Sequence, residues 1–317
     1  MTALAETMAH AITIDRVNDD APILFATGRA GIGIRAGTTI RVGERVHAFE
    51  RDISIPCNLT FEPGRDYGVG FQGGDTAFIA PLGDTNPLQA GFIAGFHFAP
   101  SACAEGTNGG DGIPAINPHS IWDVGFRPVA NPCSMACVDV SPIRRVWIDI
   151  YLLGVDHITH GTSRHGATIA DGRDLPVRTD GKGKYRKLDY ATATEICAHH
   201  GKRPIGAEEF FAAAYGVKER CARGEEPDTA GSMSNGGARF VSKWGIHDAT
   251  GTMWQWGTDG HPDDPRPSLF GGSWLDGSDA GSRYAFLDYW AEGSYELLGC
   301  RAASDHLSPA RLRESAG

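Results

Sequence analysis

The chain has 317 residues, of which 41% are hydrophobic, and a formal net charge of −10 at pH 7. This acidic balance argues against nucleic acid as a partner, because nucleic-acid binding depends on basic patches. No apolar run approaches the roughly 20 residues that a membrane helix needs, so direct membrane insertion is not expected. The 42 glycines favour many turns and short strands over long helices.

The N-terminal part predicts a small all-β domain over residues 1–90. Its first residues carry no basic stretch followed by an apolar core, so we predict no signal peptide. From Ile12 to about Ile79, β-branched and polar residues alternate at period two between glycine turns, without a helical stripe. Turn residues at 81–89 predict a linker to a second domain over residues 91–317.

The second domain is predicted as α+β, with strands first and helices later. Strands are expected at 90–98 and 144–154, on either side of a long, polar, glycine-rich loop. Two amphipathic helices are expected to follow. The first has Asp189 as N-cap and Gly201 as its stop, and the second ends at Gly216.

The chain has seven cysteines, an odd number, and they do not show the closely spaced pairs that are typical of a metal site. Free buried thiols are the expected state, with one disulfide or a metal site as the alternatives. Whether Cys133 pairs with Cys137, and whether a structural calcium ion is bound, stay open at this point.

The motifs for catalysis and metal binding are weak. His157, His160 and His165 lie close together in a Gly/Ser/Thr segment, which predicts a solvated loop rather than a metal site. His199 and His200 are expected to end a helix, where a cation interacts favourably with the helix dipole. No phosphate-binding loop, nucleophile elbow or EF-hand pattern is present. We therefore predict no catalytic residue, no metal ligand and no cofactor.

The stretch from Leu269 to Leu307 crowds large aromatic residues between glycines, serines and acids. From Tyr284 to Tyr295 the aromatic positions follow neither period 2 nor period 3.6, which packing in a core would require. The mixture is typical of a binding surface, because Tyr and Trp give large contact areas with few rotatable bonds. An exposed binding surface is the favoured interpretation, and core packing is the alternative.

The ends of this stretch, "LFGGSW", "AGSR" and "LGCRAASDHL", resemble the C-terminal variable region of diversity-generating-retroelement variable proteins, which include phage tropism determinants. Upstream segments such as "IWDVGFRP" and "SKWGIHDATGTMWQWG" resemble the lectin-fold part of such proteins. The resemblance implies a C-type lectin fold of the formylglycine-generating-enzyme-like subtype. It also implies scaffold roles for Gly271, Gly272, Trp274, Gly281, Ser282, Arg283, Gly299, Arg301, Asp305 and His306, with the planar fork of Arg283 holding carboxylates or carbonyls.

In this family, adenines of template Asn codons are randomised, so variable positions receive codons that end in a pyrimidine. The resemblance thus implies that the ligand-binding variable residues are Leu275, Asp276, Asp279, Tyr284, Phe286, Asp288, Tyr289, Ser294, Tyr295 and Leu297. Trp290 joins them, although Trp290, Glu292 and Glu296 cannot be reached from an Asn codon alone and are either fixed or derived from other codons. Ser273 fits either class.

The resemblance implies a non-enzymatic receptor-binding protein, located on a phage virion (tail fibre tip) or a bacterial cell surface. Its ligand would be a cell-surface protein or glycan, its N-terminal domain would anchor or oligomerise it, and a homotrimer is a possible assembly. Acids among the variable residues suggest a basic or hydrogen-bond-donating ligand.

The alternative is a formylglycine-generating (sulfatase-modifying) oxidase that has lost or altered its cysteine pair. Such enzymes share the fold and need a redox-active pair of cysteines near the C-terminal end. Here Cys300 is alone in its segment and precedes Arg301, whereas the enzyme motif places Cys after Arg.

Overall fold

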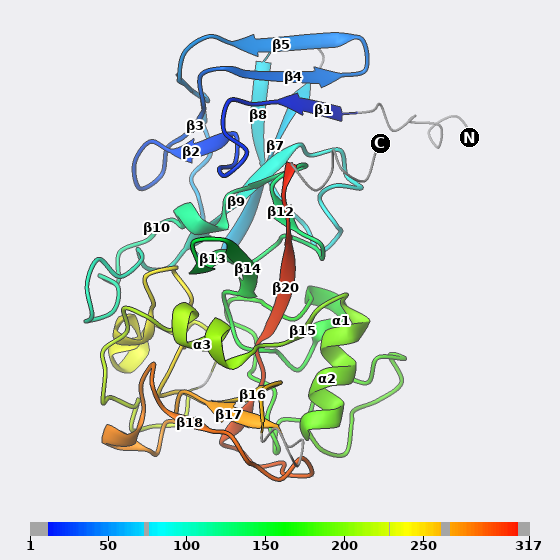
Figure 1. Cartoon of the computed structure of the whole chain (residues 1–317). Helices are drawn as coiled ribbons and strands as arrows, with labels where there is room; N and C mark the ends of the chain where they lie inside the picture. The colour runs from blue at the N-terminus through cyan, green and yellow to red at the C-terminus, as the bar shows by residue number, and fades with distance from the viewer. Residues whose placement is uncertain (1–11, 73–75, 228, 261–266, 310–317) are drawn as a thin grey trace.

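The structure is a computed structural model that describes residues 12–72, 76–227, 229–260 and 267–309. In these ranges the chain is mostly β, with few and short helices (Figure 1). The expected absence of a signal peptide concerns residues 1–11, which lie outside the described residues. Among the described residues, no helix combines the length and apolar character needed to cross a membrane.

The first part of the chain forms two three-stranded antiparallel sheets, with orders β1-β4-β5 and β2-β3-β6. The predicted alternation is confirmed in β4, where Thr38 and Ile40 are buried and Arg41 is exposed. The strands are β1 Ile12–Asp15, β2 Leu24–Ala26, β3 Ile32–Ile34, β4 Thr38–Val42, β5 Arg45–Phe49 and β6 Ile53–Ser54.

The next sheet has the order β10-β9-β7-β8, with β11 paired to β9. Its strands are β7 Arg65–Gln72, β8 Thr76–Pro81, β9 Ala94–Ala99, β10 Ala115–Ile116 and β11 Trp122–Asp123. Because Tyr67 of β7 lies opposite Phe96 of β9, the sheet crosses the predicted boundary at residue 90. One buried cluster runs from Ile23 to Ile121. The hydrogen bonding thus favours an N-terminal β unit that ends near residue 123.

The C-terminal part contains two sheets, with orders β12-β20-β14-β13 (β15 pairs with β20) and β18-β17-β16-β19. The last strand, β20, lies inside the first of these sheets, with Ser304 opposite Trp147 of β14. The strands are β12 Arg127–Pro128, β13 Met135–Ser141, β14 Arg144–Asp149, β15 Arg203–Pro204, β16 Trp254–Gly257, β17 Ser268–Phe270, β18 Ala285–Phe286, β19 Leu298–Gly299 and β20 Ala302–Leu307.

Both predicted helices are confirmed. The N-cap Asp189 starts α2, because its carboxylate accepts a hydrogen bond from the backbone N–H of Thr192 at 2.9 Å. The stop residue Gly201 has the left-handed φ of +67°. In α3, Phe210 stacks on Phe270 with ring centroids 5.0 Å apart. The helices are α1 His157–His160, α2 Tyr190–His199 and α3 Ala207–Ala213, and the 3-10 segments are η1 Pro118–Ser120, η2 Ser234–Phe240 and η3 Gly277–Asp279.

The solvated loop predicted around His157 is wrong, because this residue belongs to α1 and is buried. Its Nε2–H donates to the Val177 carbonyl at 2.7 Å, so its Nδ1 accepts from His200 Nε2 at 2.9 Å. Burial lowers the pKa of His200 to about 4, so it is not the helix-ending cation that we expected.

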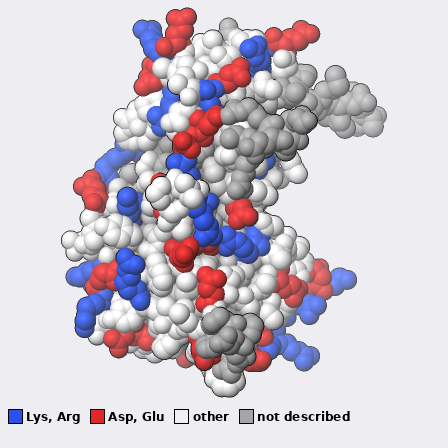
Figure 2. Space-filling view, viewed as in Figure 1, with Lys and Arg blue, Asp and Glu red and all other residues white. Residues whose placement is uncertain are grey.

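The described residues contain no group of three or more His, Cys, Asp or Glu side chains that could hold a metal ion. All seven cysteines are free thiols, including Cys133 and Cys137. On the face shown in Figure 2, basic and acidic side chains are interspersed, and no continuous basic surface is visible.

Candidate functional site: a solvated loop face

The candidate site lies at the end of the molecule opposite β1, β4 and β5, around β16, β17, β18 and the loops that follow them (Figure 1). We call it the variable face and define it by the eleven predicted variable residues. None of the eleven is buried. The exposed members are Leu275, Asp279, Phe286, Asp288, Trp290 and Tyr295. The half-buried members are Asp276, Tyr284, Tyr289, Ser294 and Leu297.

Large apolar and aromatic side chains on this face are exposed to solvent. Phe286 is 54% exposed, Trp290 66% and Tyr295 56%. Leu287 is not among the predicted variable residues, but it is 51% exposed and lies between two of them in the sequence. That position in the chain is the only sequence feature that points to it. Burial of such a side chain gains roughly 1.5–3 kcal/mol. Four such side chains exposed between residues 286 and 295 therefore mark a surface that a partner can cover.

Two of the aromatic residues, Tyr284 and Tyr289, are half-buried and support the face from below. Tyr284 and Tyr289 pack against a buried cluster that includes Trp256. The Tyr289 ring meets Trp256 at a centroid distance of 5.9 Å, and burial raises the pKa of Tyr289. The Tyr284 hydroxyl donates to the Ser278 carbonyl at 2.9 Å. Binding surface and core packing, the two sequence-based alternatives, thus each describe part of the run.

Two polar members shape the loops. Asp276 Oδ2 accepts a hydrogen bond from the backbone N–H of Ser273 at 2.6 Å and another from the Ser273 hydroxyl. Ser294 Oγ accepts from the backbone N–H of Leu188 at 2.8 Å. These two predicted variable positions therefore contribute to loop geometry besides lying at the surface.

Main-chain hydrogen bonds hold the loop between β18 and β19 from behind. They run from Tyr190 N to Ala291 O (3.0 Å), Gly172 N to Tyr295 O (3.0 Å), Trp254 N to Leu297 O (2.9 Å) and Tyr289 N to Pro267 O (3.1 Å). Such bonds use groups that every residue except proline carries. The loop can therefore keep its course while its side chains change.

Arg301 is the buried centre of the scaffold beneath the face, with only 1% of its surface exposed. Burial lowers its pKa to about 10, so it stays charged at neutral pH. Its guanidinium donates to Gln255 Oε1 (2.9 Å) and to the carbonyls of Asp149 (2.8 Å), Ile150 (2.8 Å), His247 (2.7 Å) and Asp248 (3.0 Å). The fork ties segments far apart in the sequence into one support.

Arg283 does not have the scaffold role that we predicted. It is exposed and makes no hydrogen bond or ion pair with another described residue, and it lines a cleft of about 520 Å³. The backbone before it is instead fixed by Glu219, which accepts from the Ser282 N–H at 3.1 Å and from its hydroxyl. The arginine side chain is thereby left on the solvent side. Sequence reasoning missed Glu219, because nothing local links it to Ser282.

The scaffold glycines Gly271, Gly272, Gly281 and Gly299 are buried. Gly272 has a φ of +79°, and a Cβ built there would lie 2.6 Å from the Ala280 Cβ. A larger residue at this position would meet both backbone strain and a clash.

The remaining scaffold residues are placed differently. Trp274 is half-buried against the main C-terminal core. His306 Nδ1 accepts a hydrogen bond from Trp147 Nε1 at 3.0 Å. Asp305 is 71% exposed at its side chain and pairs with Arg203 at 3.3 Å, so its contribution to stability is small.

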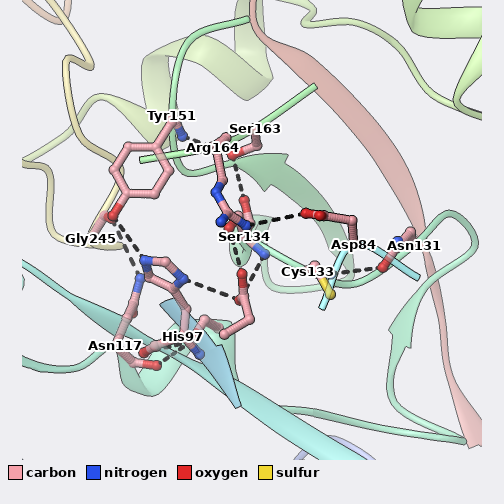
Figure 3. A network of polar contacts seen from close by, with 12 residues as sticks. Asp84, His97, Asn117, Asn131, Cys133, Ser134, Tyr151, Ser163, Arg164 and Gly245 are labelled. Atoms are coloured by element: carbon pink, nitrogen blue, oxygen red, sulfur yellow. Dashed lines mark hydrogen bonds and ion pairs between the residues drawn. The ribbon is translucent and has the colours of Figure 1, made fainter. Parts of the chain in front are cut away.

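A polar network joins the N-terminal β unit to the C-terminal part (Figure 3). His97 on β9 lies 3.1 Å from Asp66 through Nδ1 and 2.8 Å from the Tyr151 hydroxyl through Nε2. Asp66 also accepts from the Ser134 hydroxyl at 2.7 Å. His97 and Tyr151 are fully buried, so their part of the network joins the two parts inside the molecule. No sequence motif pointed to it.

These features are typical of a class of ligand-binding proteins. The chain is mostly β and presents a solvent-exposed loop face rich in aromatic residues on a hydrogen-bonded scaffold. Residues 22–123 match the family described as Mtd second domain. The chain is 35% identical over 324 residues to the "Tail fiber receptor-binding protein" of Bordetella phage BPP-1. The aligned region covers 91% of this chain and 84% of that protein.

Solved structures of the Major Tropism Determinant U1 and I1 variants match with TM-scores of 0.82 and 0.83 at 31% identity, over 93% of this chain and 86% of each of theirs. The chain therefore belongs to the family of phage tail fibre receptor-binding proteins that includes the major tropism determinants. The predicted family resemblance is confirmed. The family match ends at residue 123, where β11 also ends.

Proposed function

We propose that this chain is a non-enzymatic receptor-binding protein of a phage virion and binds its ligand through the variable face. One observation carries the proposal: backbone hydrogen bonds fix the loop between β18 and β19 while large aromatic side chains on it stand in water. The relatives named above are described as receptor-binding and tropism proteins, which supports the same function.

The ligand class that we propose is a protein or glycan on the surface of the host cell. Exposed acids, among them Asp279, Glu292 and Glu296, stand beside the exposed aromatic residues. Carboxylates favour a partner with basic or hydrogen-bond-donating groups, and such charge complementarity raises association rates. Binding should then weaken as salt is added.

Three further features belong to the proposal. The C-terminal part would have a C-type lectin fold of the formylglycine-generating-enzyme-like subtype. The N-terminal β unit, with its end near residue 123, would anchor or oligomerise the chain, and its distance from the variable face in Figure 1 supports this division of labour. A homotrimer would present three faces together, so that avidity multiplies a modest single-site affinity.

We further propose that a retroelement diversifies the variable face. Deep sequencing of the 3′ end of the gene in a population of its source tests this directly. Substitutions should concentrate in codons 273–297, while Gly271, Trp274 and Arg301 stay fixed. Substitutions spread evenly along the gene, or a uniform sequence in a population with an active reverse transcriptase, would contradict diversification.

The binding role has its own test on intact host bacteria. Phe286→Ala, Trp290→Ala and Tyr295→Ala should each reduce adsorption of the full chain at least tenfold, since aromatic anchors dominate interfaces. Ile143→Ala is the matched control, because Ile143 is 98% exposed in the turn between β13 and β14. Equal adsorption by all four variants would refute the assignment of the face.

A further inference from the structure

The fold gives Cys300 a partner that its own segment lacks. The Sγ atoms of Cys197 and Cys300 lie 3.7 Å apart, although the residues are separated by 103 positions in the chain. Each residue is only 1% exposed. The hydrogen bonds among the described residues include no second contact between two cysteine sulfur atoms.

The two cysteines connect elements that support the variable face. Cys197 lies on the buried side of α2, next to Ile196, and Cys300 lies between β19 and β20. Both belong to the buried cluster against which Tyr289 packs. The Cys300 backbone is held by the N–H of Leu153, which donates to its carbonyl at 2.9 Å.

We propose that Cys197 and Cys300 form an oxidisable pair, which closes to a disulfide under oxidising conditions and locks α2 to the base of the variable face. A disulfide requires sulfur atoms about 2.05 Å apart, so the two must approach by roughly 1.6 Å from their 3.7 Å separation. At 3.7 Å the two sulfur atoms are in contact, so no other side chain lies between them.

The oxidant in this proposal is a low-molecular-weight disulfide. One protein thiolate attacks it and releases one small thiol, and the second protein thiolate then displaces the other small thiol. Two protein thiols thus lose two protons and two electrons, and one small disulfide becomes two small thiols. The hydrogen bond with Cys300 and burial raise the pKa of the Cys197 thiol. The reaction therefore proceeds through local opening and is slow, and the closed disulfide is shielded from reductants.

Closure would affect the scaffold more than the ligand contacts. The cross-link spans 103 positions, a segment that includes α3 and the whole variable face. Cross-linking a loop of this length strongly restricts the unfolded chain. The variable face would thus gain a rigid base whose stability does not depend on the side chains displayed above it.

The test uses the full chain, reduced with dithiothreitol and then incubated with hydroxyethyl disulfide at a series of thiol-to-disulfide ratios. After alkylation of free thiols, digestion without reductant should release one linked peptide that contains Cys197 and Cys300. The melting temperature should rise on oxidation by about 5–10 °C. Both residues recovered as alkylated thiols, or each capped separately by the reagent, would overturn the proposal.

Variants separate this pair from the other thiols. Cys197→Ala and Cys300→Ala should each abolish the difference in melting temperature between the oxidised and reduced forms. Cys221→Ala, which removes a half-buried thiol outside the pair, should retain it. The difference is measured within each variant, so a general loss of stability does not affect the result. Receptor binding is not part of the readout, so failure here leaves the proposed function untouched.

Discussion

At the scale of single residues, Arg283 and Arg301 show how burial decides what a side chain does. Both lie in or beside the predicted variable region and both were expected to hold the scaffold. Arg301 donates five hydrogen bonds inside the protein, whereas Arg283 faces solvent. An ammonium group cannot reproduce the planar fork.

Arg301→Lys should therefore lower the free energy of unfolding by about 3 kcal/mol or more, because several buried carbonyls lose their donors. Arg283→Lys, the matched substitution at an exposed site, should change it by less than about 0.5 kcal/mol. Denaturant unfolding of both variants provides the measurement. Equal losses would show that the hydrogen bonds of Arg301 do not carry the scaffold.

The neighbours Tyr289 and Trp290 form a second contrast. Tyr289 packs against the buried cluster, and Trp290 is 66% exposed. We expect Tyr289→Ala to destabilise the chain by about 1–3 kcal/mol, because it removes partly buried contacts. Trp290→Ala should leave the melting temperature nearly unchanged. Thermal melts check this, and a larger loss for Trp290→Ala would place the tryptophan in the core.

At the scale of elements, α1 meets the C-terminal end of α2 through the neutral histidine pair of His157 and His200, the residue that follows α2. Burial lowers the pKa of both imidazoles, that of His200 to about 4 from its usual 6.5. Between these two values the unfolded chain binds a proton that the folded chain does not. Stability is therefore fully present above pH 6.5 and decreases as the pH falls towards 4.

Melting temperatures between pH 7 and pH 5 should reveal this decrease. His200→Gln should make the pH dependence shallower, because the amide can still donate to His157 but does not titrate. The slope that remains belongs to other histidines whose pKa burial lowers, among them His119 and His247. His199→Gln replaces the exposed neighbour and should keep the wild-type slope. A profile for His200→Gln that matches the wild type would show that the neutral pair does not contribute to the pH dependence.

At the scale of the whole molecule, the two parts of the chain are joined by the buried network of Asp66, His97 and Tyr151. Asp66→Ala should lower the free energy of unfolding by about 2–4 kcal/mol, because buried donors lose their acceptor. Asp15→Ala, which removes a 69% exposed carboxylate paired with Arg41 at 3.7 Å, should cost less than about 1 kcal/mol. Calorimetry measures both, and similar losses would argue against the junction.

The sequence alone determined the local features: period-two strands in the first 80 residues, the Asp189 cap of α2 and the composition of the variable region. These depend on residues a few positions apart, so their physical causes can be read locally. The family followed from glycines and polar residues at fixed spacing. Which of the aromatic side chains are buried could be predicted from the sequence only in part, because a loop has no regular periodicity of buried and exposed positions.

Tertiary structure alone decided the features that join distant residues. The β7–β9 pairing carries the first unit past residue 90, and the half-buried His200 imidazole contacts His157. Packing also brings Cys197 against Cys300. Each of these contacts depends on which surfaces meet when the chain folds. Their free energy comes from burial and from hydrogen bonds between segments that are distant in the sequence. Local sequence spacing does not encode them.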